Sequence, residues 1–341
     1  METIYYKTGS GDDGEAFSRA GGIIRSGGLV AFPTETVYGL GGNAYSSESS
    51  RKIYAAKGRP QDNPLIVHVA RPEDASEFAV VNGAYEKLAA AFMPGPLTVI
   101  LPKKPNMPDS TTGGLATVAV RCPSHPAARA LIEAARCPIA APSANLSGKP
   151  SPTSAAHVAR DLDGRIDMII DGGECEIGLE STVISIDGTT VRILRPGAVT
   201  CEMLADAGIE ASVDEAVCDP AKAGEKPASP GMKYKHYAPD APLYLVEGGT
   251  DELLAAARQA ALTPAAVMCR SDEEERFAGF IVLDTGEDEA EFARRLFSLL
   301  RRADESGAKS IYAHLPSRKG IGLALYNRII RAAAGKIIKR P

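Results

Sequence analysis

The chain has 341 residues, of which 44% are hydrophobic and 24% are charged, a composition typical of folded globular proteins. This length exceeds that of one typical domain, so we expect two domains. The formal net charge of −5 argues against a chain-wide electrostatic grip on nucleic acid, although it leaves room for a local basic patch.

The sequence shows no signal for a membrane or a secretory route. The N-terminal segment lacks a basic stretch followed by an apolar run, so we expect no signal peptide. No apolar run reaches the roughly 18 residues that a membrane helix needs. The six cysteines have no CxxC spacing and stand at positions 122, 137, 175, 201, 218 and 269. We therefore expect reduced thiols and a cytoplasmic location rather than a metal site or a disulfide framework.

Helical and extended patterns alternate along the first two hundred residues. Apolar residues at helical spacing predict helices over 15–26, 47–56, 84–92, 127–136 and 151–162, the last opened by Ser151 and Pro152. Short apolar runs predict strands over 29–32, 65–69, 97–101, 117–121, 139–141 and 168–171. Asp187-Gly188 predicts a hairpin between strands 181–186 and 191–194, and Thr200 fits the start of a short helix. The fold class is α/β, with a mixed, twisted sheet in a domain at residues 1–205.

Hydrophobic periodicity disappears between residues 210 and 242, where five prolines interrupt the chain. A plain linker is one interpretation of residues 206–241. However, residues 231–237 combine two lysines, a histidine and two tyrosines, which is richer in functional groups than a spacer requires. We expect this segment to act as a lid over an active site.

A second alternation begins at residue 242. Strands are expected over 243–246, 265–269, 280–283 and 311–314, and helices over 250–261, 287–302 and 323–333. Regular alternation of this kind predicts a smaller, Rossmann-like parallel α/β domain at residues 242–341. The sequence contains no GxxxxGK[ST] loop, no GxGxxG after a strand and no HExxH.

Candidate functional groups lie where predicted strands end. The stretch at 31–42, AFPTETVYGLGG, stops a strand at Pro33 and continues with Thr34, Thr36 and glycines, as either a binding site or an ordinary loop would. Lys57 and Arg59 flank a turn, where they would hold phosphate oxygens or form a solvated helix end.

Further polar groups repeat this pattern. His68 in an apolar strand is typical of a core histidine, and Arg121 at a strand end suits either a ligand or a structural ion pair. Ser151 would cap a helix or face an anion. Hydroxyl, amide or guanidinium groups also stand in turns at Asn63, Ser143, Asn145, Ser181 and Arg195. The sequence shows no recognisable catalytic dyad or acidic pair. The pattern therefore favours binding of an anionic, oxygen-rich ligand over covalent catalysis.

Seven ordered motifs resemble the threonylcarbamoyl-AMP synthase family, and an eighth resembles the linker of its long, two-domain Sua5-type members, which join a YrdC-like domain to a Sua5 C-terminal domain. The motifs are FPTETVYGLGGNA, KGRPQDNPLIVHV, MPGPLTVIL, VAVRCPSHP, APSANLSGKPSPT, GLESTVI, ILRPG and SPGMKYKHYAP. The resemblance covers essentially the whole chain.

This resemblance implies a nucleotidyltransferase. It would form threonylcarbamoyl-AMP and pyrophosphate from L-threonine, bicarbonate and ATP, with Mg²⁺ accompanying ATP, and would supply the machinery that transfers the threonylcarbamoyl group to tRNA. The implied threonine contacts are Thr36 or Thr34, His68, Arg121, the backbone at Ala141, and Ser181. The implied ATP contacts are Lys57, Arg59, Asn63, Thr117, Ser143, Asn145, Ser151, Arg195 and Tyr237. Lys57 and Arg59 would neutralise phosphate charge, and no residue would form a covalent intermediate.

Two other functions compete with this one. The concave face could bind RNA, as in a translation or ribosome-assembly factor, although the net charge and the lack of interleaved basic and aromatic runs weigh against it. Another carbamoyl-transfer enzyme, related to hydrogenase maturation proteins, is the second alternative, but its zinc-finger-like CxxC segments are missing here. The sequence leaves direct tRNA contact open.

Overall fold

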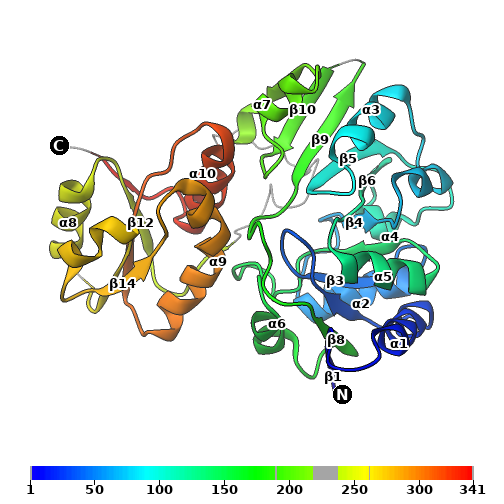
Figure 1. Ribbon diagram of the computed structural model, residues 1–341, viewed down its shortest axis with the longest axis horizontal. Helices are drawn as coiled ribbons and strands as arrows, with labels where there is room; N and C mark the ends of the chain where they lie inside the picture. The colour runs from blue at the N-terminus through cyan, green and yellow to red at the C-terminus, as the bar shows by residue number, and fades with distance from the viewer. Residues whose placement is uncertain (1, 189, 218–236, 261, 340–341) are drawn as a thin grey trace. The chain divides into compact units, whose positions relative to one another are not determined.

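The computed structural model describes residues 2–188, 190–217, 237–260 and 262–339. The chain forms two compact units, each with its own sheet (Figure 1). The first unit comprises Met1–Ser147, Ser151–Glu176 and Glu180–Lys233, and the second comprises Gly148–Pro150, Ile177–Leu179 and Tyr234–Pro341. Two short segments of the N-terminal half therefore belong to the second unit.

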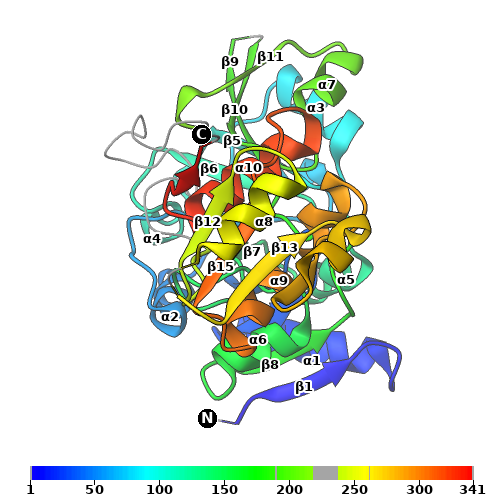
Figure 2. The same ribbon diagram turned by 90° about the vertical axis from the view of Figure 1, so that its left-hand side faces the viewer.

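An eleven-stranded mixed sheet forms the first unit, in the order β1-β8-β2-β3-β7-β4-β6-β5-β9-β10-β11. Its strands are β1 (Ile4–Lys7), β2 (Val30–Phe32), β3 (Gly39–Asn43), β4 (Ile66–His68), β5 (Leu97–Pro102), β6 (Thr117–Arg121), β7 (Ile139–Ala141), β8 (Met168–Asp171), β9 (Thr182–Asp187), β10 (Thr190–Arg195) and β11 (Ala211–Val213). β4 and β6 run parallel, whereas β5 and β6 are antiparallel. Figures 1 and 2 show β1 and β8 beside α6 at one end of this unit, and β9 to β11 with α7 at the other.

The helices of the first unit begin and end largely where local signals place them. They are α1 (Asp13–Arg25), α2 (Ser47–Lys57), α3 (Gly83–Phe92), α4 (Asp109–Thr112), α5 (Pro126–Ala135), α6 (Ala155–Leu162) and α7 (Cys201–Asp206), with 3-10 turns η1 (Pro72–Glu77) and η2 (Glu215–Val217). Ser46 caps α2 through a bond from the Ser49 amide, and Gly58 ends this helix at φ 61°. Only glycine adopts that left-handed conformation without strain.

Apolar side chains pack on both faces of this sheet. Val30 and Phe32 of β2 join one core with α1 and α5, whereas Ala31 joins the larger core on the opposite face. Residues alternate between the faces of a strand, so a continuous apolar run is what a strand buried on both sides requires. The α/β class and the mixed sheet expected for the N-terminal domain are confirmed.

Several segments differ from the sequence-based expectations. Residues 39–43, part of the expected loop, form β3, which pairs with β2. The helix expected from Ser151 begins at Ala155, because Ser154 accepts the capping bond from the His157 amide. Residues 211–213, which fell in the expected linker, form β11 beside β10. Residues 218–236, most of the expected lid, lie outside the described residues.

The second unit has a five-stranded, all-parallel sheet in the order β14-β13-β15-β12-β16. Its elements are β12 (Leu243–Val246), α8 (Thr250–Arg258), β13 (Ala265–Cys269), η4 (Ser271–Phe277), β14 (Ile281–Asp284), α9 (Glu289–Glu305), β15 (Ser310–His314), α10 (Gly320–Ala332) and β16 (Ile337–Ile338). α8 lies on one side of this sheet, and α9 and α10 lie together on the other (Figure 1). The smaller parallel α/β domain is thus confirmed. None of the described helices has the length and apolar character of a membrane span.

Candidate functional site

Three neighbouring strands bring His68, Arg121 and Thr98 into one row. His68 of β4 pairs in register with Arg121 of β6, which pairs in turn with Thr98 of β5. Each of these residues is preceded or followed by a valine of the larger core, so the polar row occupies the opposite face of the sheet. Residues far apart in the sequence therefore share one short stretch of surface.

Arg121 forms a buried ion pair with Glu35. Its Nη2 atom lies 2.8 Å from Oε1 of Glu35, and both side chains are 5% exposed. Of the two interpretations left open by the sequence, the structural pair is therefore present. Nevertheless, the Arg121 Nε group has no hydrogen-bond partner among the described residues. A buried donor without a partner is costly, so the guanidinium has capacity for a ligand.

No motif or spacing in the sequence singles out Glu35. Its other carboxylate oxygen accepts a bond from the Ser124 amide at 3.3 Å, so the carboxylate fixes two segments that are distant in the sequence. The available signal was its position between Thr34 and Thr36, within a stretch otherwise made of hydroxyl, apolar and glycine residues. An acidic residue there needs a cation once the stretch is buried.

His68 is neutral and fixed in orientation. Its Nδ1 lies 3.1 Å from the Ile66 carbonyl oxygen, and the Ile139 backbone also bonds the ring. The ring contacts Phe32 edge-on at 5.9 Å between centroids. Burial, together with the charge of Arg121, lowers the pKa of His68 to about 3. His68 therefore offers shape and polarity at neutral pH, but no positive charge.

The hydroxyl groups of Thr34 and Thr36 have different hydrogen-bonding roles. The Thr34 hydroxyl donates to the Val37 carbonyl at 2.6 Å and accepts from two backbone amides, of Thr36 and Val37. The two hydroxyl oxygens lie 2.8 Å apart. Because the Thr34 hydrogen is committed to Val37, Thr36 must be the donor in this pair. Thr34 thus holds the turn, and the Thr36 oxygen keeps accepting capacity.

Glycines in the opening stretch serve packing of the sheet. A Cβ atom at Gly41 would lie 2.7 Å from a methyl carbon of Ile139 and 2.9 Å from the Phe32 ring, and one at Gly39 would lie 3.1 Å from Phe32. Both glycines therefore match the close packing of their neighbours in the sheet. They let the hairpin of β2 and β3 lie flat against aromatic and branched side chains.

Ser181 receives two partners from different strands. Its hydroxyl lies 2.8 Å from the Thr98 hydroxyl and accepts a bond from the Arg195 Nη2 group at 3.2 Å. Arg195 also donates twice to the Ser181 carbonyl. The guanidinium expected at the nucleotide therefore also anchors the start of β9, and Ser181 extends the polar row beyond Thr98.

Lys57 is buried, so its interpretation as a solvated helix end is wrong. The ammonium donates to the Ser143 carbonyl, to the Asn145 carbonyl at 2.5 Å and to the Asn145 side-chain oxygen at 3.4 Å. Burial and the charge of Arg59 lower the pKa of Lys57, while three oxygen acceptors match the three N–H groups of its charged form. The lysine fixes the loop that carries Ser143 and Asn145.

Arg59 and Asn63 form one side of the expected nucleotide site. Arg59 donates to the Asn63 carbonyl at 3.3 Å and to the Pro64 carbonyl at 3.1 Å, which rigidifies the turn after α2. Asn63 is 2% exposed, and its side-chain oxygen has no hydrogen-bond partner among the described residues. A buried, unpartnered amide oxygen is an available acceptor.

β6 carries predicted contacts for both substrates. Thr117 begins this strand and Arg121 ends it. An even separation puts both side chains on one face, and four residues of strand span about 13 Å. Ala141 of β7 is in register with Ile66 of β4, so its backbone lies beside the same strands.

Ser151 does not cap a helix. Its hydroxyl donates to the Glu180 carboxylate at 2.5 Å, and both residues are buried. This bond joins the loop before α6 to the start of β9, next to Ser181. The expected helix cap is therefore wrong for Ser151, and Glu180 is a second acidic residue outside the expected contacts.

Tyr237 belongs to the second unit. It has a φ of 63°, is buried, and stacks on Phe297 of α9 with ring centroids 5.1 Å apart. A tyrosine in the left-handed region is held there by its surroundings, since the conformation is strained for a side chain with a Cβ atom.

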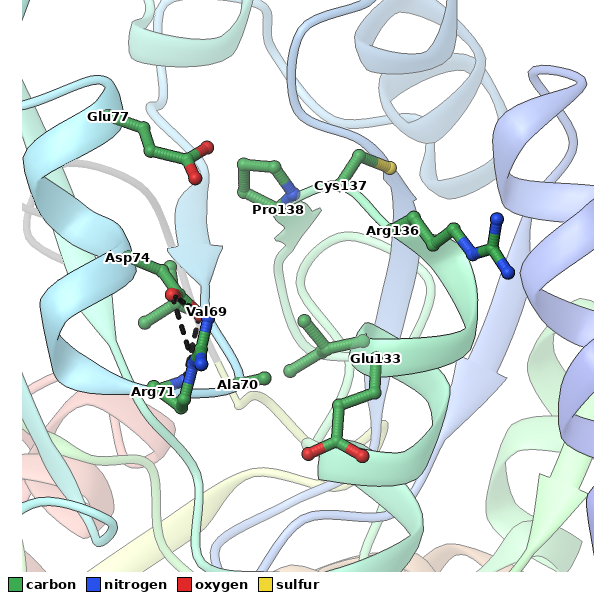
Figure 3. A pocket seen from close by; sticks show the side chains of 10 residues that line it. Val69, Ala70, Arg71, Asp74, Glu77, Glu133, Arg136, Cys137 and Pro138 are labelled. Atoms are coloured by element: carbon green, nitrogen blue, oxygen red, sulfur yellow. Dashed lines mark hydrogen bonds and ion pairs between the residues drawn. The ribbon is translucent and has the colours of Figure 1, made fainter.

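The hollow in Figure 3 is not the predicted site. It has a volume of about 370 Å³ and lies between η1 and the end of α5. Its lining includes the carboxylates of Asp74, Glu77 and Glu133, with Arg71 paired to Asp74 at 2.9 Å. None of the residues implied by the motifs lines it, and its acidic groups disfavour a triphosphate. The described residues contain no group of three or more His, Cys, Asp or Glu side chains that could hold a metal ion.

Known proteins resemble this chain over nearly its full length. A family model for Sua5, YciO and YrdC, described as "Telomere recombination", matches residues 22–197, and one described as "Threonylcarbamoyl-AMP synthase, C-terminal domain" matches residues 199–334. The threonylcarbamoyl-AMP synthases of Pyrococcus abyssi and Bacillus subtilis are 46% and 45% identical to it, each match covering 94% of both chains. The crystal structure of P. abyssi Sua5 complexed with L-threonine superposes with a TM-score of 0.91 at 42% identity, covering 100% of both chains. The chain belongs to the Sua5/YrdC family, in the long form that carries a Sua5 C-terminal domain.

Proposed function

We propose that the chain is a threonylcarbamoyl-AMP synthase that converts L-threonine, bicarbonate and ATP into threonylcarbamoyl-AMP, pyrophosphate and water. The names of its relatives support this activity. The observation that carries the proposal is the buried Arg121 with an unused donor, in a row with neutral His68 and next to the Thr34–Thr36 turn. This arrangement suits the carboxylate of an amino acid.

We assign the threonine end of the site to this polar row. The Arg121 Nε group would donate to the substrate carboxylate, and the Thr36 oxygen would accept from the substrate hydroxyl or amine. Ser181 and the backbone at Ala141 would bound the same pocket, with His68 closing it as a neutral wall. The complex of P. abyssi Sua5 with L-threonine supports an amino-acid site in this family.

The nucleotide end would begin at the other end of β6. Arg59, Asn63 and Thr117 would contact ATP from one side, with Ser143 and Asn145 on the loop that Lys57 holds. Ser151, Arg195 and Tyr237 complete the proposed set. Lys57 would act mainly through this loop, because its N–H groups already point at loop oxygens.

The chemistry needs no protein nucleophile. The threonine amine attacks the carbon of bicarbonate or carbon dioxide and gives a carbamate, with water leaving overall. A carbamate oxygen then attacks the α-phosphorus of ATP, and the bond to the departing pyrophosphate breaks. Such transfer asks the protein for positioning and charge neutralisation, which the arginines supply. Mg²⁺ would bind together with ATP and neutralise part of the triphosphate charge. We assign no protein ligands to this ion.

The product is a reactive mixed anhydride, so it requires a partner that transfers its threonylcarbamoyl group. We propose that this partner is the tRNA-modifying machinery and that the reaction takes place in the cytoplasm. The five described cysteines are unpaired, in keeping with a reducing compartment.

Incubation of the purified chain with threonine, bicarbonate and MgATP tests the proposal. Mass spectrometry should detect threonylcarbamoyl-AMP, and pyrophosphate release should require threonine and bicarbonate but no RNA. Omission of each substrate in turn is the control. Pyrophosphate release that depends on RNA, or RNA binding without any adenylate product, would favour the alternative of an RNA-binding factor.

A further inference from the structure

A second hollow of the first unit lies between η1, α3 and α5. It has a volume of about 740 Å³, within the range of roughly 300–1,000 Å³ that small-molecule sites have. All the residues that line it stand between Ala70 and Arg129, so it is formed within one unit of the chain. Its lining includes none of the residues assigned to threonine or ATP.

Arg129 of α5 contributes a guanidinium to the lining of this hollow. Its Nε group is buried and has no hydrogen-bond partner among the described residues, and no ion pair joins it to a described carboxylate. The other arginine of the lining, Arg71, is already paired with Asp74 at 2.9 Å. A buried donor without an acceptor is costly, so Arg129 is the group of this lining with capacity for an anion.

An apolar stripe along α3 belongs to the same lining. Tyr85, Ala89 and Met93 are spaced four residues apart, which puts them on one face of the helix and its end. They are 3%, 6% and 8% exposed, so they lie at the base of the hollow. The Tyr85 hydroxyl donates to the Pro72 carbonyl at 2.8 Å, and this residue therefore offers a ligand mainly its ring. The base of the hollow is thus a hydrocarbon surface.

Two carboxylates limit the charge that a ligand can carry here. Glu73 and Glu86 line the hollow and are exposed, so they form part of its rim. Their negative charges disfavour a multiply charged anion such as phosphate. A single carboxylate group, in contrast, can pair with the planar guanidinium of Arg129 through two parallel hydrogen bonds. The lining therefore suits one negative charge joined to an apolar body.

We propose that this hollow binds a small monocarboxylate with an apolar body, its carboxylate on Arg129 and its hydrocarbon part on the α3 stripe. Arg129 fixes the orientation of the ligand, and burial of the hydrocarbon part against Tyr85, Ala89 and Met93 supplies much of the affinity. The site goes beyond the proposed synthase function, since it shares no residue with the threonine or ATP contacts and requires no step of that reaction.

Isothermal titration of the full chain with sodium octanoate tests the proposal, because octanoate carries one carboxylate on an apolar chain. It should bind at one saturable site. Acetate has the charge without the chain, and 1-octanol has the chain without the charge, so both should bind at least about tenfold more weakly. Equal affinity for octanoate and 1-octanol, or no saturable binding of octanoate, would overturn the proposal.

Substitution of Arg129 shows whether this guanidinium holds the carboxylate. Arg129→Met should weaken octanoate binding about ten- to hundredfold and leave 1-octanol binding unchanged, whereas Arg129→Lys should keep part of the affinity. The matched control is Arg136→Met, because Arg136 is an exposed arginine at the end of the same helix and lies outside this lining. Its octanoate affinity should equal that of the wild type. Undiminished octanoate binding in Arg129→Met would contradict the assignment.

Competition separates this site from the proposed threonine pocket. If octanoate paired with Arg121 instead, threonine would displace it, so saturating threonine and ATP should leave the octanoate affinity unchanged. Hydrogen exchange of peptides covering residues 70–95 should slow on addition of octanoate in the wild type and not in Arg129→Met. Displacement by threonine, or slowing confined to other peptides, would refute the proposed location. A chain without synthase activity would refute the proposed function and not this site, since none of these measurements needs turnover.

Discussion

Replacing Arg121 by alanine removes one member of a buried ion pair and should separate threonine binding from ATP binding. Without the guanidinium, threonine loses a charge-assisted hydrogen bond, worth about 1.5–3 kcal/mol. This corresponds to roughly ten- to hundredfold weaker binding. ATP binding should change by no more than about twofold, because its proposed contacts begin at the other end of β6.

Stability changes in the same variant must be separated from binding. Arg121→Ala leaves Glu35 buried without its cation, which costs roughly 3–5 kcal/mol. The double variant Arg121→Ala/Glu35→Gln removes both charges and should regain most of this stability. It should not regain threonine binding, since the donor is still missing.

Calorimetric titration with threonine and with ATP, together with urea unfolding, checks all three proteins. Threonine affinity restored in the double variant would refute the assignment of the carboxylate to Arg121. Equal losses of threonine and ATP affinity in both variants would show that the damage is general.

Three further changes test other parts of the structure. Lys57→Met should leave two loop carbonyls without a donor, lower the free energy of unfolding by about 1–3 kcal/mol and raise the KM for ATP. His68 has its pKa lowered to about 3, so between this value and about 6.5 the unfolded chain binds a proton that the folded chain does not. His68 should therefore lower the free energy of unfolding by up to about 1.4 kcal/mol per pH unit as the pH drops through this window, and His68→Gln should remove that share of the pH dependence in denaturant titrations. Gly41→Ala should destabilise the chain by about 1–3 kcal/mol through overlap with Ile139, whereas Gly11→Ala, where no atom lies within 4 Å, should unfold at the wild-type denaturant concentration.

These predictions also have clear contrary outcomes. A Lys57→Met variant of unchanged stability would mean that the loop does not depend on the ammonium. A pH dependence of the same slope in His68→Gln and in the wild type would show that His68 is not the titrating group. Equal stability of the Gly41 and Gly11 variants would show that β3 tolerates side chains.

Strands whose apolar residues are consecutive could be predicted from the sequence, and β3 could not. β5 and β6 are rich in Val, Ile and Leu, which suit a strand buried between two layers. β3 reads GLGGN, and glycine gives no local preference for a strand. It becomes a strand because β2 and β7 pair with it on either side.

The start of α6 shows how tertiary hydrogen bonds override a local signal. Ser151 followed by Pro152 has the pattern of a helix start, but Ser154 has the capping bond. The intervening backbone is used elsewhere: the Pro152 carbonyl accepts from the Tyr38 amide, and the Thr153 carbonyl accepts from the Cys175 amide. Such long-range partners cannot be inferred from spacing along the chain.

The motifs predicted which types of residue form the candidate site, but they did not predict the hydrogen-bond and ion-pair partners of these residues. Arg121 was expected to need an anion. Glu35 supplies this anion, because the turn after β2 folds back over β6. Likewise, Lys57 looked like a helix-end charge, and its burial follows from the position of the loop at residues 143–145. The chemistry of a side chain is local, whereas its burial and partners are properties of the whole fold.

In the proposed site, the even spacing of Thr117 and Arg121 along β6 sets the distance between the two substrates. Inserting a single residue between them would turn one side chain to the opposite face, into the apolar core, and not merely shift it along the strand. Residues would have to be inserted into this segment two at a time, and each pair would move Thr117 and Arg121 apart by about 7 Å. In the proposed site, the distance between amino acid and nucleotide is therefore adjustable along β6 only in these steps, and finer adjustment has to come from the loops around the strand.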